Sequence, residues 1–450
     1  MIPPKPAARP EKVSLLRYLR LFRQDILSAQ PARLYRAWMA EFRTPFFRSY
    51  LVNQPELVKT VLKDRPLDFP KSGRVSEGLR PLLGASVFLT NGAQWQRQRR
   101  IIDPAFEGGR LRETYPAMWD AAQAALARLA ARAGEEVEIE EETSHAAADI
   151  IFRTLFSIPI EDALAAQVFH EFRTYQRTQP ILNLAAFVPL PRWLPRFHRP
   201  GARAAARRIR ALITELTERR MAEIRAGTAP DDLATKIMTT RDPETGETFS
   251  TEEMVDQVAI FFLAGHETSA SALAWAFYLA ATHPDWQARL AEEAQVLGEV
   301  PAFSDIARLR ISRDVFRETL RLYPPVPMMV RETSRPERFR DRALRTGSQV
   351  VLSPWHQHRH ERLWENPHGF DPARWGTGNG RQCQREAYMP SSAGPRVCTG
   401  AGFAMVEGVL MLSLILRDLK LSPVEGRVPE PVAFLTLRAR DGIHLRVDKR

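Results

Sequence analysis

The feature that most constrains the fold is a long apolar segment that runs from Ser250 to Pro284, "STEEMVDQVAIFFLAGHETSASALAWAFYLAATHP". Ser250 and Glu253 have the Ser-x-x-Glu spacing of a capping box, which starts a helix, and the proline ends it. The predicted helix has about 33 residues and is about 50 Å long. Because it is apolar on almost every side, it must run through the protein core. His266 and Glu267 in its middle argue against a membrane span, since a buried charge is costly there.

Other segments predict more helices and a few short strands. Helices are expected over 111–133 and 311–322, and a last long helix should begin just after Cys398. Residues 1–45 are expected to form an arm and a first amphipathic helix, followed by a strand over 46–53. The predicted fold class is therefore mainly α with small β-sheets.

Composition narrows the class of protein. With 44% hydrophobic and 26% charged residues, the chain is expected to be a folded globular protein rather than a disordered or fibrous one. Two cysteines exclude a disulfide framework and fit a reducing cytosol. A net charge of +11 suits nucleic acid, an anionic membrane surface or an acidic protein partner. Dispersed arginines without zinc-finger spacing argue against nucleic acid. The N-terminus lacks an apolar stretch for a signal peptide or transmembrane anchor, so we expect a soluble, cytoplasmic protein.

The glycine-rich stretch "AGPRVCTGAG" contains Cys398 just before a predicted helix. Unpaired N–H groups and the helix dipole at such a position stabilise a thiolate. Gly394, Gly400 and Gly402 would let backbone amides approach the sulfur, and Arg396 adds a cation. A lone cysteine can also be a small apolar core residue, so the interpretation as a ligand needs support elsewhere.

The stretch "AGHETS" in the long helix offers such support. Gly265 costs about 1 kcal/mol relative to alanine in a helix interior, and it would let a large group pass close to the backbone. Glu267 and Thr268 beside it could relay protons. The alternative is a tolerated glycine next to a satisfied polar pair.

A charged pair in "FRETLRLYPPVP" supplies a third feature. Glu318 and Arg321 are three residues apart and share one face of a helix. Exposed pairs contribute little to stability. Apolar neighbours, Phe316 and Leu320, suggest that this pair is at least partly buried and acts as a structural lock.

Taken together and in this order, these stretches resemble the cytochrome P-450 family of haem-thiolate monooxygenases over nearly the whole chain. "WQRQRRIIDPAF" resembles the helix whose Trp95 and Arg99 face the haem propionates. "VRETS" places Arg331 where the family commonly has another propionate partner. "FDPARW" supplies Arg374 as the usual third member of the lock with Glu318 and Arg321.

The resemblance implies a cofactor and a set of residues around it. Cys398 would be the axial thiolate ligand of haem b, which would lie between the long central helix and the helix after the cysteine loop. Glu267 and Thr268 resemble the family's acid–alcohol pair, whose role is proton delivery. The remaining cofactor-binding positions that the resemblance implies are Ala264, Gly265, Gly394, Arg396 and Gly400.

The sequence departs from the family ahead of the cysteine. Ser391 stands seven residues before Cys398, where phenylalanine is usual, and Ser392 stands at a position that is usually glycine. Serine would leave that side of the haem smaller and wetter, or would offer the thiolate a hydrogen bond, and such changes tune redox potential. We therefore expect a shifted potential and weaker haem retention than in a Ser391→Phe variant.

The implied function is insertion of one oxygen atom from O2 into a small apolar organic substrate. Only 52 residues follow Cys398 and none of them indicates a flavin or nicotinamide fold, so residues 1–450 are expected to be a single haem domain without a fused reductase. We expect a monomer. The alternatives are a peroxide-dependent peroxygenase and a non-catalytic haem-binding protein. The pair of Glu267 and Thr268 favours the monooxygenase, because peroxide already carries its electrons and protons.

Electrons would then come from a separate acidic ferredoxin or flavodoxin with its reductase. The family's partner docks on the cysteine side, where five arginines could form a positive patch, or could merely keep the surface soluble. These arginines are Arg97, Arg99, Arg100, Arg381 and Arg385.

Two further segments and one helix face are expected to line the substrate pocket. They are residues 71–90, parts of the proline-rich apolar segment 180–200, and the helix face with Ile260, Phe261 and Ala264. For segment 180–200, a buried connection is the alternative to a ligand entrance. Fatty acid, terpene, steroid and aromatic ether substrates all remain open.

Overall fold

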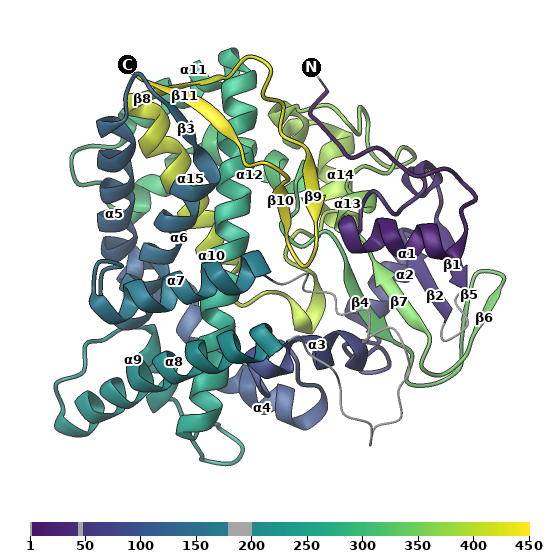
Figure 1. The fold of residues 1–450 in the computed structure, drawn as a ribbon, viewed down its shortest axis with the longest axis horizontal. Helices are drawn as coiled ribbons and strands as arrows, with labels where there is room; N and C mark the ends of the chain where they lie inside the picture. Colours follow the sequence, from purple (N-terminus) through teal and green to yellow (C-terminus); the bar gives the residue numbers. More distant parts are fainter. Residues whose placement is uncertain (1, 44–47, 179–199) are drawn as a thin grey trace.

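The computed structural model describes residues 2–43, 48–178 and 200–450. A thick helical region makes up one side of the molecule, and the larger sheet lies at the other side (Figure 1). The α-helices are α1 (Leu15–Gln24), α2 (Pro55–Lys59), α3 (Gly73–Leu83), α4 (Gly92–Ile102), α5 (Gly108–Ala131), α6 (Ile139–Phe156), α7 (Ala163–Thr178), α8 (Pro200–Ala226), α9 (Leu233–Thr239), α10 (Thr251–Thr282), α11 (Pro284–Glu293), α12 (Arg310–Leu322), α13 (Pro354–Gln357), α14 (Gly378–Glu386) and α15 (Ala401–Asp418). The mainly α fold class is confirmed.

The long central helix α10 forms as the capping signals predict. The Ser250 hydroxyl accepts a hydrogen bond from the Glu253 N–H at 3.2 Å, and the Glu253 carboxylate accepts one from the Ser250 N–H at 2.9 Å. The helix ends at Thr282, two residues before Pro284. It packs against α6, α8 and α15, and most of its side chains are buried, as its apolar circumference requires.

Small sheets flank the helices. The strands are β1 (Met39–Arg43), β2 (Arg48–Val52), β3 (Glu136–Glu138), β4 (Met329–Glu332), β5 (Glu337–Phe339), β6 (Arg342–Leu344), β7 (Gln349–Leu352), β8 (Leu419–Pro423), β9 (Pro431–Ala433), β10 (Leu437–Ala439) and β11 (His444–Lys449). The largest sheet has the order β1-β2-β7-β4, with β2 and β7 parallel and in register at Tyr50 and Val350. A second sheet has the order β3-β11-β8, and β5–β6 and β9–β10 are antiparallel pairs.

The N-terminal region corrects one prediction. A strand was expected only at 46–53, and β2 confirms it over Arg48–Val52. Residues 1–45, however, contain α1 and also the strand β1, which pairs with β2 from Met39↔Val52 to Arg43↔Arg48. Strand β1 depends on this pairing, so the sequence of the arm alone does not reveal it.

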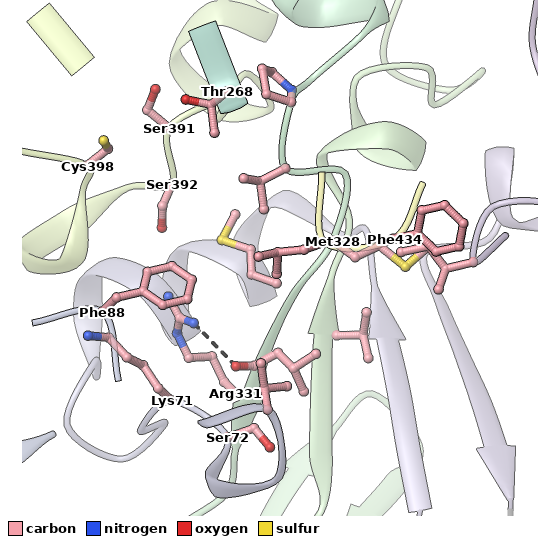
Figure 2. Close-up of a pocket in the computed structure, with 18 of the residues that line it drawn as sticks. Lys71, Ser72, Phe88, Thr268, Met328, Arg331, Ser391, Ser392, Cys398 and Phe434 are labelled. Atoms are coloured by element: carbon pink, nitrogen blue, oxygen red, sulfur yellow. Dashed lines mark hydrogen bonds between the residues drawn. The ribbon is translucent and has the colours of Figure 1, made fainter. Parts of the chain in front are cut away.

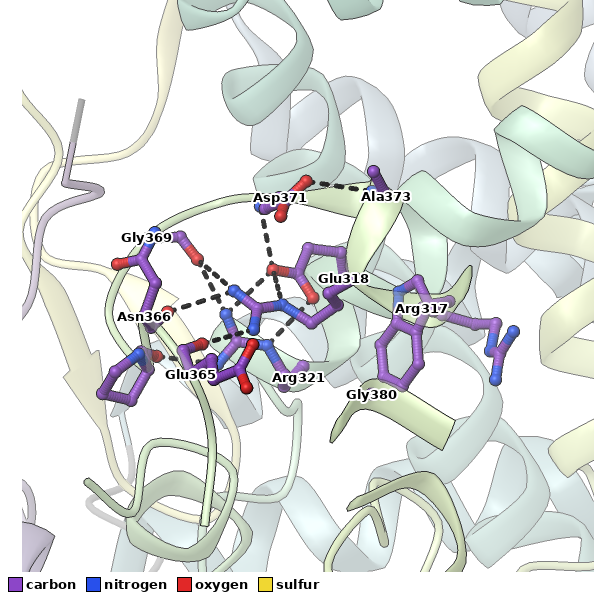
Figure 3. Close-up of polar contacts among 12 residues, drawn as sticks. Arg317, Glu318, Arg321, Glu365, Asn366, Gly369, Asp371, Ala373 and Gly380 are labelled. Carbon is purple, nitrogen blue, oxygen red and sulfur yellow. Dashed lines mark hydrogen bonds and ion pairs between the residues drawn. The ribbon is translucent and has the colours of Figure 1, made fainter. Parts of the chain in front are cut away.

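Glu318, Arg321 and Arg374 meet in a buried cluster that connects α12 to the segment before the cysteine loop. Figure 3 shows Glu318 and Arg321 in this cluster. The Arg321 guanidinium donates to both carboxylate oxygens of Glu318 at 2.9 and 2.8 Å, and Arg374 Nε donates to Glu318 Oε1 at 2.9 Å. Both arginines also donate to the Gly369 carbonyl, at 2.8 and 3.2 Å. The structure therefore brings the three predicted lock residues together, with more complete burial than the sequence suggested.

The described residues include no helix with the length and the apolar character needed to cross a bilayer.

Candidate active site

A cavity of about 990 Å³ lies between α10, α3, β4 and the cysteine loop. Figure 2 shows Cys398, Ser391 and Thr268 at one end of it, and Lys71 and Arg331 below them. The predicted site residues that line this cavity are Trp95, Arg99, Ala264, Thr268, Arg331, Arg396, Cys398 and Gly400. Segments that are far apart in the sequence, such as α4 and the loop before α15, thus line the same cavity.

Cys398 is held at the end of the loop by backbone contacts. Its N–H donates to the Ser391 carbonyl at 3.0 Å, and the Gly400 N–H is hydrogen-bonded to the sulfur. Burial raises the pKa of the Cys398 thiol, while the Gly400 N–H and the Arg99 charge oppose this rise. The hydrogen bond from the Gly400 N–H and the charge of Arg99 act in the direction that the sequence predicts, and desolvation acts against them. A metal cation bound to the sulfur would favour the thiolate further.

The three glycines of the loop, which were all expected to let the backbone approach the sulfur, have different neighbours. A Cβ on Gly400 would lie 4.0 Å from the Cys398 sulfur, so this glycine does approach the sulfur. Gly394 has φ +69°, and a Cβ there would lie 2.0 Å from the Leu62 carbonyl oxygen. A Cβ on Gly402 would instead meet Leu111 of α5 at 3.2 Å. Two of the three glycines thus serve chain packing rather than the sulfur.

Three cations around the cavity lack an acidic partner. In the described part of the chain no ion pair joins Lys71, Arg331 or Arg396 to a carboxylate, and the buried Nε of Arg396 has no hydrogen-bond partner. Burial, followed by the charges of Arg331, Arg396 and Arg99, lowers the pKa of Lys71 to about 6. Burial and Arg396 lower the pKa of Arg331 to about 10. Such a cluster is costly unless an anion joins it.

Arg99 differs from these cations. Its guanidinium pairs with Asp103 at 2.8 Å and donates to the Val397 carbonyl at 2.7 Å. The charge of Arg99 is therefore partly compensated by Asp103, and its hydrogen bond to Val397 connects α4 to the cysteine loop. Arg396 donates to the Phe69 carbonyl at 2.9 Å and lies over the Trp95 ring, 5.1 Å from its centre.

Helix α10 distributes the residues of "AGHETS" over several sides. Ala264 and Thr268 face the cavity, and the Thr268 hydroxyl donates to the Ala264 carbonyl at 2.6 Å. A Cβ on Gly265 would lie 2.4 Å from Ile151 Cδ1, so this glycine admits a side chain of α6 and does not line the cavity. The structure thus places Gly265 against α6, whereas its neighbour Ala264 lines the cavity. His266 also turns toward α6, where its Nε2 lies 2.6 Å from the Ser144 hydroxyl.

Glu267 lies beside the cavity but does not line it. Its Oε1 accepts hydrogen bonds from the Thr436 hydroxyl and from Arg438, both in the C-terminal region. The carboxylate is buried, whereas the Arg438 side chain is 31% exposed. Its Oε2 has no partner among the described residues. The ion pair of Glu267 and Arg438 thus extends from the core to the surface.

The two unusual serines flank the approach to Cys398. Ser391 lines the cavity, and its carbonyl accepts the Cys398 N–H. Ser392 has φ +66°, a left-handed conformation that favours glycine. Its hydroxyl has no hydrogen-bond partner in the described structure.

Most of the predicted positive patch is already neutralised. Arg97 pairs with Glu253 at 2.7 Å, and Arg100 pairs with Asp242 at 2.6 Å. Together with the pairing of Arg99, this leaves Arg381 and Arg385 of α14 as the exposed members. The acids come from distant segments, so the local sequence does not show them.

Part of the predicted substrate-pocket lining lies on this cavity. Residues of 71–90, Ile260, Phe261 and Ala264 line the cavity, whereas 180–200 lies almost wholly outside the described residues.

Sequence reasoning missed Lys71 as a cation of the site, although it falls within the predicted lining. It also missed Glu407 of α15, whose Oε2 accepts from the cavity-lining Ser269 at 2.7 Å. Burial raises the pKa of Glu407 to about 8. The sequence around Lys71 and around Glu407 contains no motif that would have identified either residue.

Comparisons with known proteins agree with this fold. The family model described as cytochrome P-450 matches residues 37–444. A cyclooctat-9-en-7-ol 5-monooxygenase from Streptomyces melanosporofaciens is 33% identical over 86% of this chain and 83% of its own length. A cyclooctatin synthase from the same organism is 32% identical over 87% and 84%. A crystal structure of a cytochrome P-450 is 25% identical, with a TM-score of 0.83 over 100% of both chains.

The chain belongs to the cytochrome P-450 family. It is a monooxygenase of that family and hence an oxidoreductase, and the family uses a haem-thiolate cofactor, O2 and a redox partner. The residues present fit such a cofactor, because a sulfur ligand and two arginines without an acidic partner among the described residues, Arg331 and Arg396, line one cavity, as a group with two carboxylates requires.

Proposed function

We propose that Cys398 binds the iron of haem b and that the enzyme oxidises a small apolar organic molecule. The observation that carries this proposal is the placement of Cys398, Thr268 and the cations Arg331 and Arg396 around one cavity. The bound haem would supply oxygen activation. The two arginines and Lys71 would hold its carboxylates, and Gly400 would hydrogen-bond the ligand sulfur.

The chain's own part in the reaction is binding, exclusion of water and proton delivery. Apolar side chains such as Ile260, Phe261 and Leu435 line the cavity, which suits a substrate with few polar groups. Thr268 would hold a proton at its Oγ1 beside the reacting centre. Glu267 would pass protons from the surface, since Arg438 is partly exposed and Glu267 Oε2 is free to accept a further hydrogen bond.

We further propose a single haem domain over residues 1–450 that acts in the cytoplasm as a monomer and receives electrons from an acidic ferredoxin or flavodoxin. The net charge of +11 supports an acidic partner, and Arg381 and Arg385 remain exposed on α14, which leads into the cysteine loop. Reduction should slow steeply with added salt and in an Arg381→Glu/Arg385→Glu variant. Salt-insensitive reduction would reject this docking site.

The first test concerns the ligand. After reconstitution with haem, the reduced protein under carbon monoxide should show the strongly red-shifted absorption of sulfur-bound iron, and Cys398→Ala should lose it. The same spectrum in both proteins would reject the role of Cys398.

The second test concerns the reaction. Product should form with O2, a reductant and a ferredoxin, and Thr268→Ala and Glu267→Gln should turn over more slowly with less product per electron. Thr436→Val serves as a control that removes one hydrogen bond to Glu267 but keeps its ion pair. Product from peroxide alone would indicate a peroxygenase, and no product under either condition would indicate a haem-binding protein.

A further inference from the structure

A buried carboxylate lies on α10 just before the part of the helix that lines the cavity. Ile260, Ala264 and Thr268, at intervals of four residues, line the cavity. Asp256 precedes Ile260 by the same interval, so it lies on the same side of the helix. Asp256 is 6% exposed, and the proposed reaction leaves it without a role. A buried carboxylate is costly without charged or polar partners, so its partners indicate what it does.

The Asp256 carboxylate holds α8 and the segment after α3 at one point. Its Oδ1 lies 2.7 Å from Arg210 Nη1 of α8, and its Oδ2 accepts the Ala85 N–H at 2.7 Å. Arg210 also donates to the Leu82 carbonyl of α3 at 3.1 Å. Gly84, with φ +51°, permits this close approach, because a Cβ there would overlap the carboxylate. Helices α3, α8 and α10 thus meet at one buried ion pair.

The next residue of α10 holds the following part of the same segment. Gln257 is fully buried, and its Oε1 accepts the Val87 N–H at 2.9 Å. Val87, Phe88 and Leu89 line the cavity, and Figure 2 shows Phe88 next to Lys71. Two adjacent polar residues of α10 therefore set where this wall of the cavity stands relative to the helix.

We propose that Asp256 and Gln257 are positioning residues that determine which molecules the cavity binds well, and that Arg210 couples α8 to the same wall. Side chains that are ordered before a ligand arrives lose little freedom when it binds. The preformed wall should therefore strengthen the binding of apolar molecules large enough to touch it. A small molecule held only beside Cys398 should not respond to the wall. The ligand test below rests on the proposed haem site, whereas the exchange test does not.

Two iron ligands of different size test the proposal in the haem-loaded full chain. Imidazole and 4-phenylimidazole bind iron through the same ring nitrogen, and only the second extends a phenyl ring toward the cavity wall. In optical titrations, Asp256→Asn, Arg210→Gln and Gln257→Leu should each weaken 4-phenylimidazole about tenfold, because the wall must then be ordered on binding. Imidazole, which needs no ordered wall, should change by less than about twofold. Equal weakening of both ligands in Asp256→Asn would overturn the proposal.

The combined variant tests whether Arg210 and Asp256 act through one contact. Arg210→Gln/Asp256→Asn should weaken 4-phenylimidazole no more than either single change, whereas independent effects would multiply to about 100-fold and overturn the coupling. Asp242→Asn is the matched control. Asp242 is buried, pairs with Arg100 at 2.6 Å and does not line the cavity. It should leave the affinity for both ligands unchanged, and the same loss in this control as in Asp256→Asn would overturn the proposal.

Hydrogen exchange measured by mass spectrometry gives a result that does not depend on the iron ligand. In Asp256→Asn and Arg210→Gln, peptides that cover 79–90 and 205–215 should exchange faster than in the wild-type protein, and peptides of α5 should not. Unchanged exchange in both peptides, or equally faster exchange throughout the chain, would overturn the proposal. If the wild-type protein lacks the red-shifted carbon monoxide band, the role of Cys398 is rejected and the exchange result alone decides the role of Asp256.

Discussion

The buried lock allows the sharpest test of what stabilises this fold. The change Glu318→Gln keeps the size of the side chain but removes its charge. Arg321 and Arg374 would keep their bonds to backbone carbonyls, and no carboxylate in the described structure would replace Glu318. Removal of one member of a buried ion pair costs about 3–5 kcal/mol, since the remaining charge is desolvated and unpaired.

The loss of the free energy of unfolding caused by Glu318→Gln is measured by urea unfolding of the haem-free proteins under identical conditions. Glu430→Gln is the matched control, because Glu430 pairs with Arg440 at a similar distance, 2.8 Å, but both side chains are about half exposed. The control should lose no more than about 1 kcal/mol of the free energy of unfolding. If Glu318→Gln loses no more than the control, the argument that burial makes this cluster essential is refuted.

Four other changes test individual contacts. Gly265→Ala should lower the free energy of unfolding by about 1–3 kcal/mol through its clash with Ile151, and Ile151→Val should restore part of the loss in a thermal melt. Ser392→Gly should raise it by up to about 1 kcal/mol, because φ at this position is left-handed; an unchanged midpoint would argue against strain. Ser391→Phe should retain haem longer in transfer to apomyoglobin and shift the redox potential, and equal values in both proteins would contradict this expectation. The buried Glu407 keeps its proton up to a pKa of about 8, whereas the unfolded carboxyl releases it near 4.5. Wild-type stability should therefore fall as pH rises between these values, and Glu407→Gln should lack this fall in urea titrations across that range.

From the sequence, we could predict only those residues of the site that lie in short recognisable motifs. Cys398 and Thr268 were identified from short stretches of sequence, and both line the cavity. Lys71 lines it too, but nothing near Lys71 in the sequence distinguishes it from a surface lysine. Arg97 and Arg100 were expected to contribute to a positive docking patch, but acids from distant segments pair with them.

By itself, the sequence determined where the central helix begins and ends, because the box of Ser250 and Glu253 and the proline at 284 act within a few residues. It also determined that a cysteine precedes the last long helix. Only the tertiary structure decided which way each residue of "AGHETS" faces. Gly265 meets Ile151 and Thr268 meets the cavity, because the rotation of α10 is set by packing against helices from other parts of the chain.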